Sequence, residues 1–142
     1  MEGAGRSVIP SACRRGAAGA VILGVAAIHV FRVGTRLQGT PQRLYYSYAS
    51  DLLLPLATYL VLCLSERNLQ RLGDWRVKAA CVFAAASSAE VLQGLGVPML
   101  GRTFDPLDFV MYAIGVLAAA LLDRVVLPAL CCSRVVRSGA TR

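Results

Sequence analysis

Residues that could carry out chemistry are concentrated in the second half of the chain. Glu90 and Gln93 are three positions apart near the end of an apolar stretch, so one face of a helix would present both side chains. Arg102, Asp105 and Asp108 follow after a short connection. Carboxyl groups act as general acids or bases, and the planar arginine fork pairs with phosphate or carboxylate groups. This combination predicts a polar site that binds a ligand or performs acid–base chemistry.

Glu90 is the most informative of these residues, because it lies inside the end of an apolar helix. A charged side chain at the centre of a membrane helix costs about 2.5–3.5 kcal/mol on insertion scales. Protonation of the carboxyl group, or pairing with Arg32 or Arg102, would offset that cost. Two interpretations remain open: a structural ion pair or interhelical hydrogen bond, and a functional polar site.

Asp105 and Asp108 also allow two interpretations. Asp105 precedes Pro106, which is typical of an N-cap followed by the first helical position, and Asp108 would then complement the positive end of the helix dipole. Alternatively, Asp108 and Tyr112 are four residues apart and share a helix face, so they could extend the site begun by Glu90.

Asp51 presents a similar choice in the second apolar run. It could cap a helix that begins at Leu52, or lie inside a helix that begins near Tyr45. Pro55 has no backbone N–H to donate to the carbonyl of Asp51, which predicts a local kink or opening. We expect His29 to be a pairing or interfacial residue, because the chain has no second histidine to complete a metal site.

The sequence lacks the common signatures of catalytic and metal sites. It has no nucleophile elbow, no phosphate-binding glycine loop and no pair of metal ligands at helical spacing. The five cysteines match no zinc or iron–sulfur spacing. We therefore assign no catalytic residue, expect no metal or cofactor, and treat an enzyme as the less favoured interpretation.

The composition indicates that membrane helices position these residues. Of the 142 residues, 56% are hydrophobic and 16% are charged, against roughly 25% charged in ordinary soluble domains. Four apolar runs are predicted to cross a bilayer, at residues 17–31, 45–64, 77–95 and 107–130. We predict an all-α integral membrane bundle of four transmembrane helices, in which a single domain at residues 17–130 lies between tails at 1–16 and 131–142.

Two further features concern the helices. The first run follows basic residues, as a signal peptide does, but it has no convincing cleavage site, and we predict an uncleaved helix. Small residues at four-residue spacing predict close contacts between helices. These stripes are Gly16, Ala20 and Gly24; Ala80, Ala84 and Ser88; and Gly115 and Ala119.

The distribution of basic residues predicts the orientation of the bundle. The two tails and the middle connection hold eleven Lys and Arg residues, whereas the other two connections hold four. We predict that the protein lies in the inner membrane of the cell. Because cytoplasmic segments are enriched in Lys and Arg, both termini are predicted to lie in the cytoplasm. The polar residues described above would then meet at the outer face. All five cysteines would lie in cytoplasmic tails or near cytoplasmic helix ends, so no disulfide framework is expected.

The net charge of +7 does not predict nucleic-acid binding. That function needs a basic face on a folded soluble domain, with aromatic or helical elements that read the nucleic acid. Here the arginines lie between apolar runs, where anionic lipid head groups would contact them.

The order of these polar residues resembles the core of VanZ-like membrane proteins. The resemblance covers residues 45–123 and consists of Glu90-x-x-Gln93, Gly101-Arg102-x-x-Asp105, Asp108, Tyr112 and Gly115. That family usually has asparagine at the position of Tyr112. The tyrosine, together with Tyr48-x-x-Asp51-Leu52, is more similar to a related group of uncharacterised small bacterial membrane proteins. The founding VanZ-like member is associated with resistance to a glycopeptide antibiotic, which acts on cell-wall precursors outside the cytoplasmic membrane.

Three functions are compatible with these observations. In the first, the outer polar cluster binds or modulates an envelope lipid, a lipid-linked cell-wall precursor or an amphiphilic antibiotic. In the second, Glu90 or Asp108 acts as general acid or base of a membrane enzyme on a lipid-linked substrate. In the third, the cluster only orients the helices of a structural assembly partner. Membrane lipids are the expected partners in each case, and the oligomeric state stays open. The cluster comprises Asp51, Glu90, Gln93, Arg102, Asp105, Asp108 and Tyr112.

Overall fold

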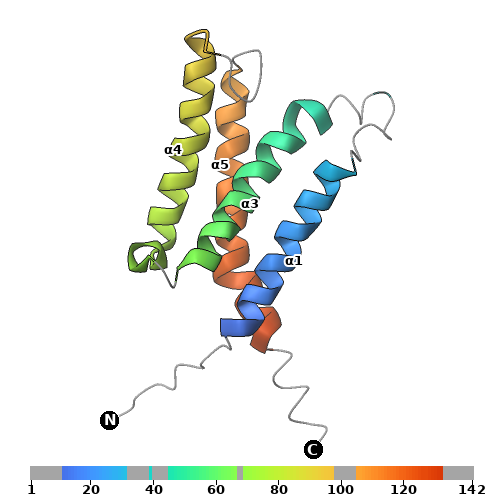
Figure 1. The fold of residues 1–142 in the computed structure, drawn as a ribbon, viewed down its shortest axis with the longest axis vertical. Coiled ribbons are helices and arrows are strands. Elements are labelled where there is room, and N and C mark those ends of the chain that lie inside the picture. The colour runs from blue at the N-terminus through green and yellow to red at the C-terminus, as the bar shows by residue number, and fades with distance from the viewer. Residues whose placement is uncertain (1–10, 32–38, 40–44, 67–68, 98–104, 133–142) are drawn as a thin grey trace, which may run out of the picture.

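The computed structural model of the protein describes residues 11–31, 39, 45–66, 69–97 and 105–132, and these residues form helices and connections without a strand. Four long helices make up the fold (Figure 1): α1 (Ser11–Val30), α3 (Ser50–Ser65), α4 (Trp75–Gly94) and α5 (Pro106–Leu121). Three short helical turns adjoin them: η2 (Tyr45–Ala49), η3 (Gln70–Gly73) and η4 (Leu122–Val126). The all-helical fold is confirmed.

The helices form a bundle in which α3 is central. It packs against α1 on one side and against α4 and α5 on the other, as Figure 1 shows. The core between them includes Tyr59, Leu60 and Ala119, which are fully buried. The start of α1 and the end of the last helical segment converge at one end of the bundle (Figure 1).

Helix ends follow the local signals in the sequence. The Asp105 carboxylate accepts a hydrogen bond from the Leu107 N–H at 2.9 Å, and Pro106 opens α5, as predicted. Asp74 caps α4 in the same way through the Arg76 N–H. Beyond the end of α4, Gly96 adopts a φ of 82°, a left-handed conformation that glycine adopts without steric cost.

The second apolar run is helical from Tyr45, so Asp51 lies inside the helical segment rather than at its start. The first turn of this segment, η2, is π-helical, and Pro55 is buried within α3. A second π-helical turn, η4, precedes Pro128, which cannot donate to the Arg124 carbonyl. Helical structure then continues to Cys132.

One of the three small-residue stripes packs inside the described bundle. A Cβ atom on Gly115 would collide with the Leu52 carbonyl oxygen and would lie 3.3 Å from the Leu52 Cα, so α3 and α5 touch through their backbones. Ala119, one turn later, is fully buried. By contrast, Cβ atoms on Gly16 and Gly24 would meet nothing within 4 Å. Ala20, Ala80, Ala84 and Ser88 are also exposed.

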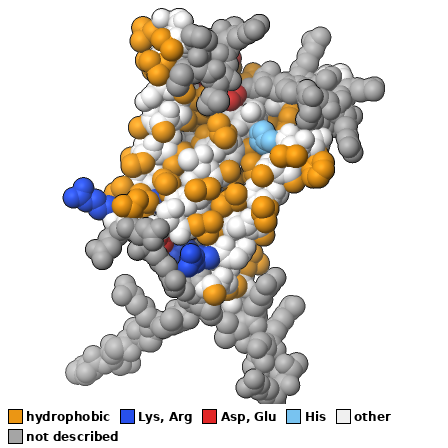
Figure 2. Space-filling view, in the orientation of Figure 1, with side chains coloured by type: hydrophobic (Ala, Val, Ile, Leu, Met, Phe, Trp, Pro, Cys, Tyr) orange, Lys and Arg blue, Asp and Glu red, His pale blue; other side chains and the backbone are white. Residues whose placement is uncertain are grey.

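Two of the described helical segments are long and apolar enough to cross a membrane, Ala12–Val30 and Pro106–Cys132. Large hydrophobic side chains also cover much of the bundle surface (Figure 2), including Leu23, Leu117 and Leu121 at 71%, 61% and 58% exposure. The helix α1 begins six residues before the predicted run, so Arg14 and Arg15 are helical rather than part of a tail. A core helix of a soluble protein or an N-terminal signal sequence can have the same length and composition.

Candidate functional site

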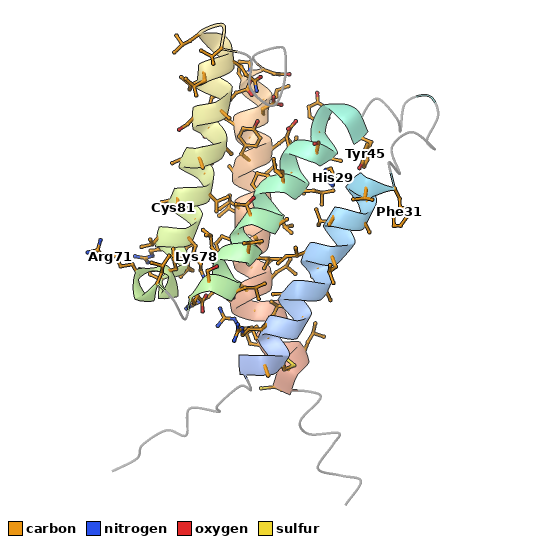
Figure 3. All side chains as sticks on the ribbon, in the orientation of Figure 1. His29, Phe31, Tyr45, Arg71, Lys78 and Cys81 are labelled. Atoms are coloured by element: carbon orange, nitrogen blue, oxygen red, sulfur yellow. A yellow bond between two sulfur atoms is a disulfide. The ribbon has the colours of Figure 1, made fainter. Side chains whose placement is uncertain are left out.

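Polar side chains collect in two places at opposite ends of the bundle. The carboxyl cluster lies where α4 ends and α5 begins, and the ion-pair cluster lies near the start of α1 and the end of α3. In Figure 3, Lys78 of the ion-pair cluster lies toward the end of the bundle opposite to His29 and Tyr45. The carboxyl cluster consists of Asp51, Glu90, Asp105, Asp108 and Tyr112. The ion-pair cluster consists of Arg14, Glu66, Lys78 and Asp123.

Glu90 joins α4 to the start of α5. Its side chain is among the most buried in the protein, at 1% exposure. One carboxylate oxygen accepts the Asp105 backbone N–H at 2.7 Å, and the other accepts the Tyr112 hydroxyl at 3.4 Å. Both oxygens therefore have protein partners, which favours the interpretation of Glu90 as an interhelical hydrogen-bonding residue.

Asp51 and Asp108 form a second, more accessible part of the carboxyl cluster. Their side chains are half-buried and lie close enough across the α3–α5 contact to interact electrostatically. Two carboxylates this close repel each other, and a hydrogen-bond donor or a cation between them would relieve that repulsion. Asp108 is therefore more than a helix-dipole partner, whereas Asp105 is accounted for by its N-cap bond to Leu107.

The carboxyl cluster is acidic. Asp51 and Asp108 repel each other, and both are repelled by Glu90 and Asp105. Among the side chains that the structure describes, no Lys or Arg forms an ion pair with these four groups; the Lys and Arg ion pairs all lie at the other end. The cluster thus presents hydrogen-bond acceptors and negative charge to whatever approaches it.

Two predicted members of the site are not placed with it. Gln93 is half-buried on α4, and its side chain has no hydrogen bond to a described residue. Arg102 lies outside the described residues, as does Arg32, the other cation expected to pair with Glu90. His29 contacts the Val25 carbonyl oxygen of its own helix at 2.9 Å, consistent with a pairing residue.

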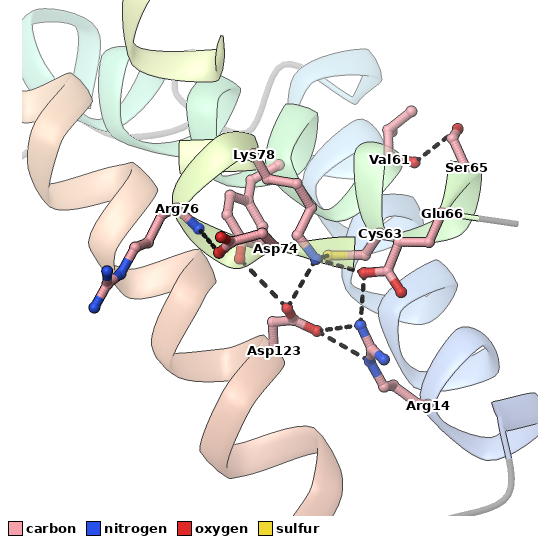
Figure 4. Close-up of polar contacts among 10 residues, drawn as sticks. Arg14, Val61, Cys63, Ser65, Glu66, Asp74, Arg76, Lys78 and Asp123 are labelled. Carbon is pink, nitrogen blue, oxygen red and sulfur yellow. Dashed lines mark hydrogen bonds and ion pairs between the residues drawn. The ribbon is translucent and has the colours of Figure 1, made fainter. Parts of the chain in front are cut away.

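The ion-pair cluster was not predicted from the sequence. Figure 4 shows Arg14 and Lys78 each bridging the two carboxylates Glu66 and Asp123. Arg14 approaches both at 2.8 Å, and Lys78 lies 3.1 Å from Asp123 and also contacts Glu66. Tyr59 donates a further hydrogen bond to Asp123 at 3.3 Å. Two positive and two negative groups balance, and α1, the end of α3, α4 and the segment after α5 contribute one each.

Cys63 adjoins the ion-pair cluster, and together with Glu66 and Asp123 it offers the donor atoms of a three-ligand metal site, all within 4.8 Å of one another. The Lys78 ammonium lies among them, 3.3 Å from the Cys63 sulfur and 3.1 Å from Asp123. A cation of the protein itself therefore already neutralises these donors, and the arrangement does not require a metal ion.

A signal for the ion-pair cluster was present in the sequence. Lys78 and Asp123 each interrupt an apolar run, and charges in such positions need partners. In the sequence, Lys78 contributes only to the count of basic residues that predicts the orientation of the bundle. Partner assignment required the helices to be placed, because Asp123 is 109 residues from Arg14 and 45 from Lys78.

The expectation that no cysteines pair is wrong for two of them. Cys13 near the start of α1 and Cys131 near the end of the last helical segment form a disulfide, with a Cα–Cα distance of 5.9 Å. They meet because these two segments converge at one end of the bundle. Among the described cysteines, Cys63, Cys81 and Cys132 are free thiols.

No family model matches the sequence, and no curated protein and no solved structure is significantly similar to it. What can be concluded about function therefore comes from the residues and contacts of the two clusters.

Proposed function

We propose that this chain is a VanZ-like multi-pass protein of the bacterial inner membrane. Its carboxyl cluster faces outward and binds the polar head of an envelope lipid, a lipid-linked cell-wall precursor or an amphiphilic antibiotic. The four helices cross the bilayer, and both termini are cytoplasmic. The VanZ-like assignment depends on the residue pattern around Glu90 and Asp108.

The apolar surface of the bundle supports the membrane location. Exposed large hydrophobic side chains occur on all four helices, including Leu23, Leu54, Val91 and Leu117. A soluble monomer rarely exposes apolar surface so widely, whereas lipid tails would cover it at no cost. The 20 residues of α4 would span about 30 Å, which matches the hydrocarbon core of a bilayer.

The placement of charge supports the orientation. The ion-pair cluster and the exposed Arg71, Arg76 and Arg124 lie at or near the end from which α4 starts, and the carboxyl cluster lies where α4 ends. Basic residues favour the cytoplasmic side of a membrane. The carboxyl cluster would then open to the outside, where cell-wall precursors and antibiotics are found.

The two neighbouring carboxyl groups of Asp51 and Asp108 are the observation that carries the binding proposal. Both side chains are half-buried, so a ligand head group can reach them, and neither has a described basic partner. Ammonium or hydroxyl donors of a head group would complement the pair. Arg102, which follows α4 in the chain, is proposed to pair with a phosphate or carboxylate of the same ligand.

Substitution of the pair tests the proposal. The sample is the full-length protein reconstituted in lipid nanodiscs, and the probes are a lipid-linked cell-wall precursor and a glycopeptide antibiotic. Asp51→Asn and Asp108→Asn should each weaken binding roughly tenfold or more. Each substitution removes a charge-assisted hydrogen bond to the ligand, worth about 1.5–3 kcal/mol. Asparagine keeps the size of the side chain, so the fold should be retained.

The matched control is Asp74→Asn at the opposite end of α4, where asparagine also serves as an N-cap. Binding should be unchanged in this variant. The proposal is wrong if the parent protein binds neither probe, or if both Asp51→Asn and Asp108→Asn bind as tightly as the parent.

The same carboxyl pair supports a second candidate function. Two neighbouring carboxyl groups can serve in acid–base catalysis when one donates a proton and the other accepts one. In that case Asp108 rather than Glu90 is the acid or base, because both oxygens of Glu90 already have protein partners. Chemical change of the precursor in the binding samples, absent with Asp108→Asn, would establish the enzyme; an unchanged precursor would leave binding as the function.

A further inference from the structure

The cytoplasmic end of the proposed topology contains a disulfide between two helices. Cys13 and Cys131 are separated by 118 residues, and their bond ties α1 to the end of the last helical segment. The position of this bond is unusual for a stable disulfide, because cytosolic disulfides are usually transient and act in catalysis or redox sensing.

The disulfide and the ion-pair cluster hold the same two segments together. Arg14, the residue after Cys13, forms ion pairs with Asp123 and Glu66. Asp123 precedes Cys131 by eight positions, or about 12 Å along a helix. Of the α1 residues whose burial is described, only Ala18 is fully buried, at 1% exposure, while Ala17, Val21, Ile22 and Val25 are partly buried against the core.

We propose that Cys13 and Cys131 form a reversible redox latch. When oxidised, the latch fixes the start of α1 to the end of the last helical segment. When it is reduced, only the Arg14 ion pairs hold the two segments together at this point. This proposal uses the cytoplasmic orientation proposed above but does not depend on the carboxyl cluster or its ligand.

The exposure of the two cysteines determines which thiol reacts first in the exchange. Cys13 is half-buried and Cys131 is fully buried. The Cys13 thiolate attacks a small-molecule disulfide such as oxidised glutathione, which forms a mixed disulfide and releases one glutathione thiolate. The Cys131 thiolate then attacks the Cys13 sulfur, forms the internal bond and releases the second glutathione thiolate. Two protein thiols are oxidised, one glutathione disulfide is reduced, and the two thiol protons end on the glutathione thiols.

Thiol counting in native membranes tests the pairing. The chain has five cysteines, of which three are free when the latch is closed. After incubation with reduced glutathione and denaturation, a polyethylene-glycol maleimide should add to five sites; after oxidised glutathione it should add to three. Reduced glutathione should restore five. Cys13→Ser and Cys131→Ser should each remove this oxidation.

Cys132→Ser is the matched control, because it removes the exposed neighbour of Cys131 and leaves the latch intact. This variant should still lose two reactive thiols on oxidation. The latch is wrong if oxidised glutathione leaves all five thiols reactive, or if Cys132→Ser abolishes the change. It is also wrong if reduced glutathione never restores more than three thiols, since the bond would then be permanent. These outcomes are independent of the ligand-binding test with Asp51→Asn and Asp108→Asn, so the latch and the proposed function can fail separately.

Limited proteolysis tests the effect on α1. Trypsin should cleave after the exposed Arg15 several-fold faster in reduced than in oxidised membranes, because the first turns of α1 open more often without the bond. In Cys13→Ser the rate should equal that of the reduced parent under both conditions. Equal rates for the oxidised and reduced parent would contradict the latch.

Discussion

At the level of single residues, the ion pairs of the described side chains lie away from the proposed ligand site. Lys78 and Asp123 are 1% and 3% exposed, yet both are charged and each has more than one partner of opposite charge. A buried ion pair adds little net stability compared with apolar residues, but removal of one member leaves a buried charge unpaired. The cluster therefore makes the contact between helices specific.

Lys78→Met should destabilise the protein by about 3–5 kcal/mol, because Glu66 and Asp123 would then share Arg14 alone. Equilibrium unfolding of the purified protein in detergent measures this change. In the double variant Lys78→Met/Asp123→Leu, one positive and one negative group disappear together, and part of the stability should return.

Arg124→Gln is the control for this series, since Arg124 adjoins Asp123 but is exposed. It should change stability by less than about 0.5 kcal/mol, as surface substitutions usually do. If Lys78→Met is no more destabilising than Arg124→Gln, the ion-pair cluster does not hold the helices together.

At the scale of elements, the contact between α3 and α5 positions the carboxyl pair. Gly115 allows the backbones of the two helices to touch at Leu52, the neighbour of Asp51. Asp108 is seven residues before Gly115, which is two turns along α5 on nearly the same face. The distance between the two carboxyl groups therefore depends on this close approach.

Gly115→Ala should destabilise the protein by about 1–3 kcal/mol and weaken ligand binding as well, because the new methyl group can be accommodated only if α3 and α5 separate. The obstacle is backbone rather than a flexible side chain. Detergent unfolding and nanodisc binding measure the two effects.

Gly24→Ala on α1 provides the comparison, because its methyl group would have no atom within 4 Å. It should be neutral, or more stable by up to about 1 kcal/mol, since alanine favours helix more than glycine does. Equal stability of the Gly115→Ala and Gly24→Ala variants would show that α3 and α5 are not in backbone contact.

At the scale of the whole molecule, the two clusters give the bundle two chemically different ends. One end is closed by balanced charges and a disulfide, and the other holds half-buried carboxyl groups. In a membrane, such a molecule would present different chemistry to the two compartments. The orientation decides which compartment supplies the ligand.

Labelling with a membrane-impermeant maleimide tests the orientation. In intact cells, Gln38→Cys and Leu100→Cys should react from outside, because both positions lie in connections predicted to face outward. The parent has exposed Cys81 and Cys132, which are predicted to lie near the cytoplasmic end of a helix and in the cytoplasmic tail, and it should react only after permeabilisation. Labelling of Leu100→Cys only after permeabilisation would place the carboxyl cluster on the cytoplasmic side and remove the proposed access to extracellular ligands.

Features that depend on neighbouring residues could be predicted from the sequence alone. The helical segments, the Asp105 cap, the placement of Pro106 and the acidic character around Glu90 all follow from local pattern, and the structure agrees with them. Four membrane crossings and their direction remain predictions from composition and charge.

The contacts between side chains far apart in the sequence became visible only in the folded bundle. The pairing of Asp51 with Asp108, the bridging of Glu66 and Asp123, and the disulfide between Cys13 and Cys131 depend on how each helix is rotated and shifted against its neighbours. An apolar run predicts that a helix forms. When all sides of that helix are apolar, the periodicity of the sequence does not predict which side faces the core. In this bundle, the close contact at Gly115 and the neutralisation of the buried charges determine which side of each helix faces the core.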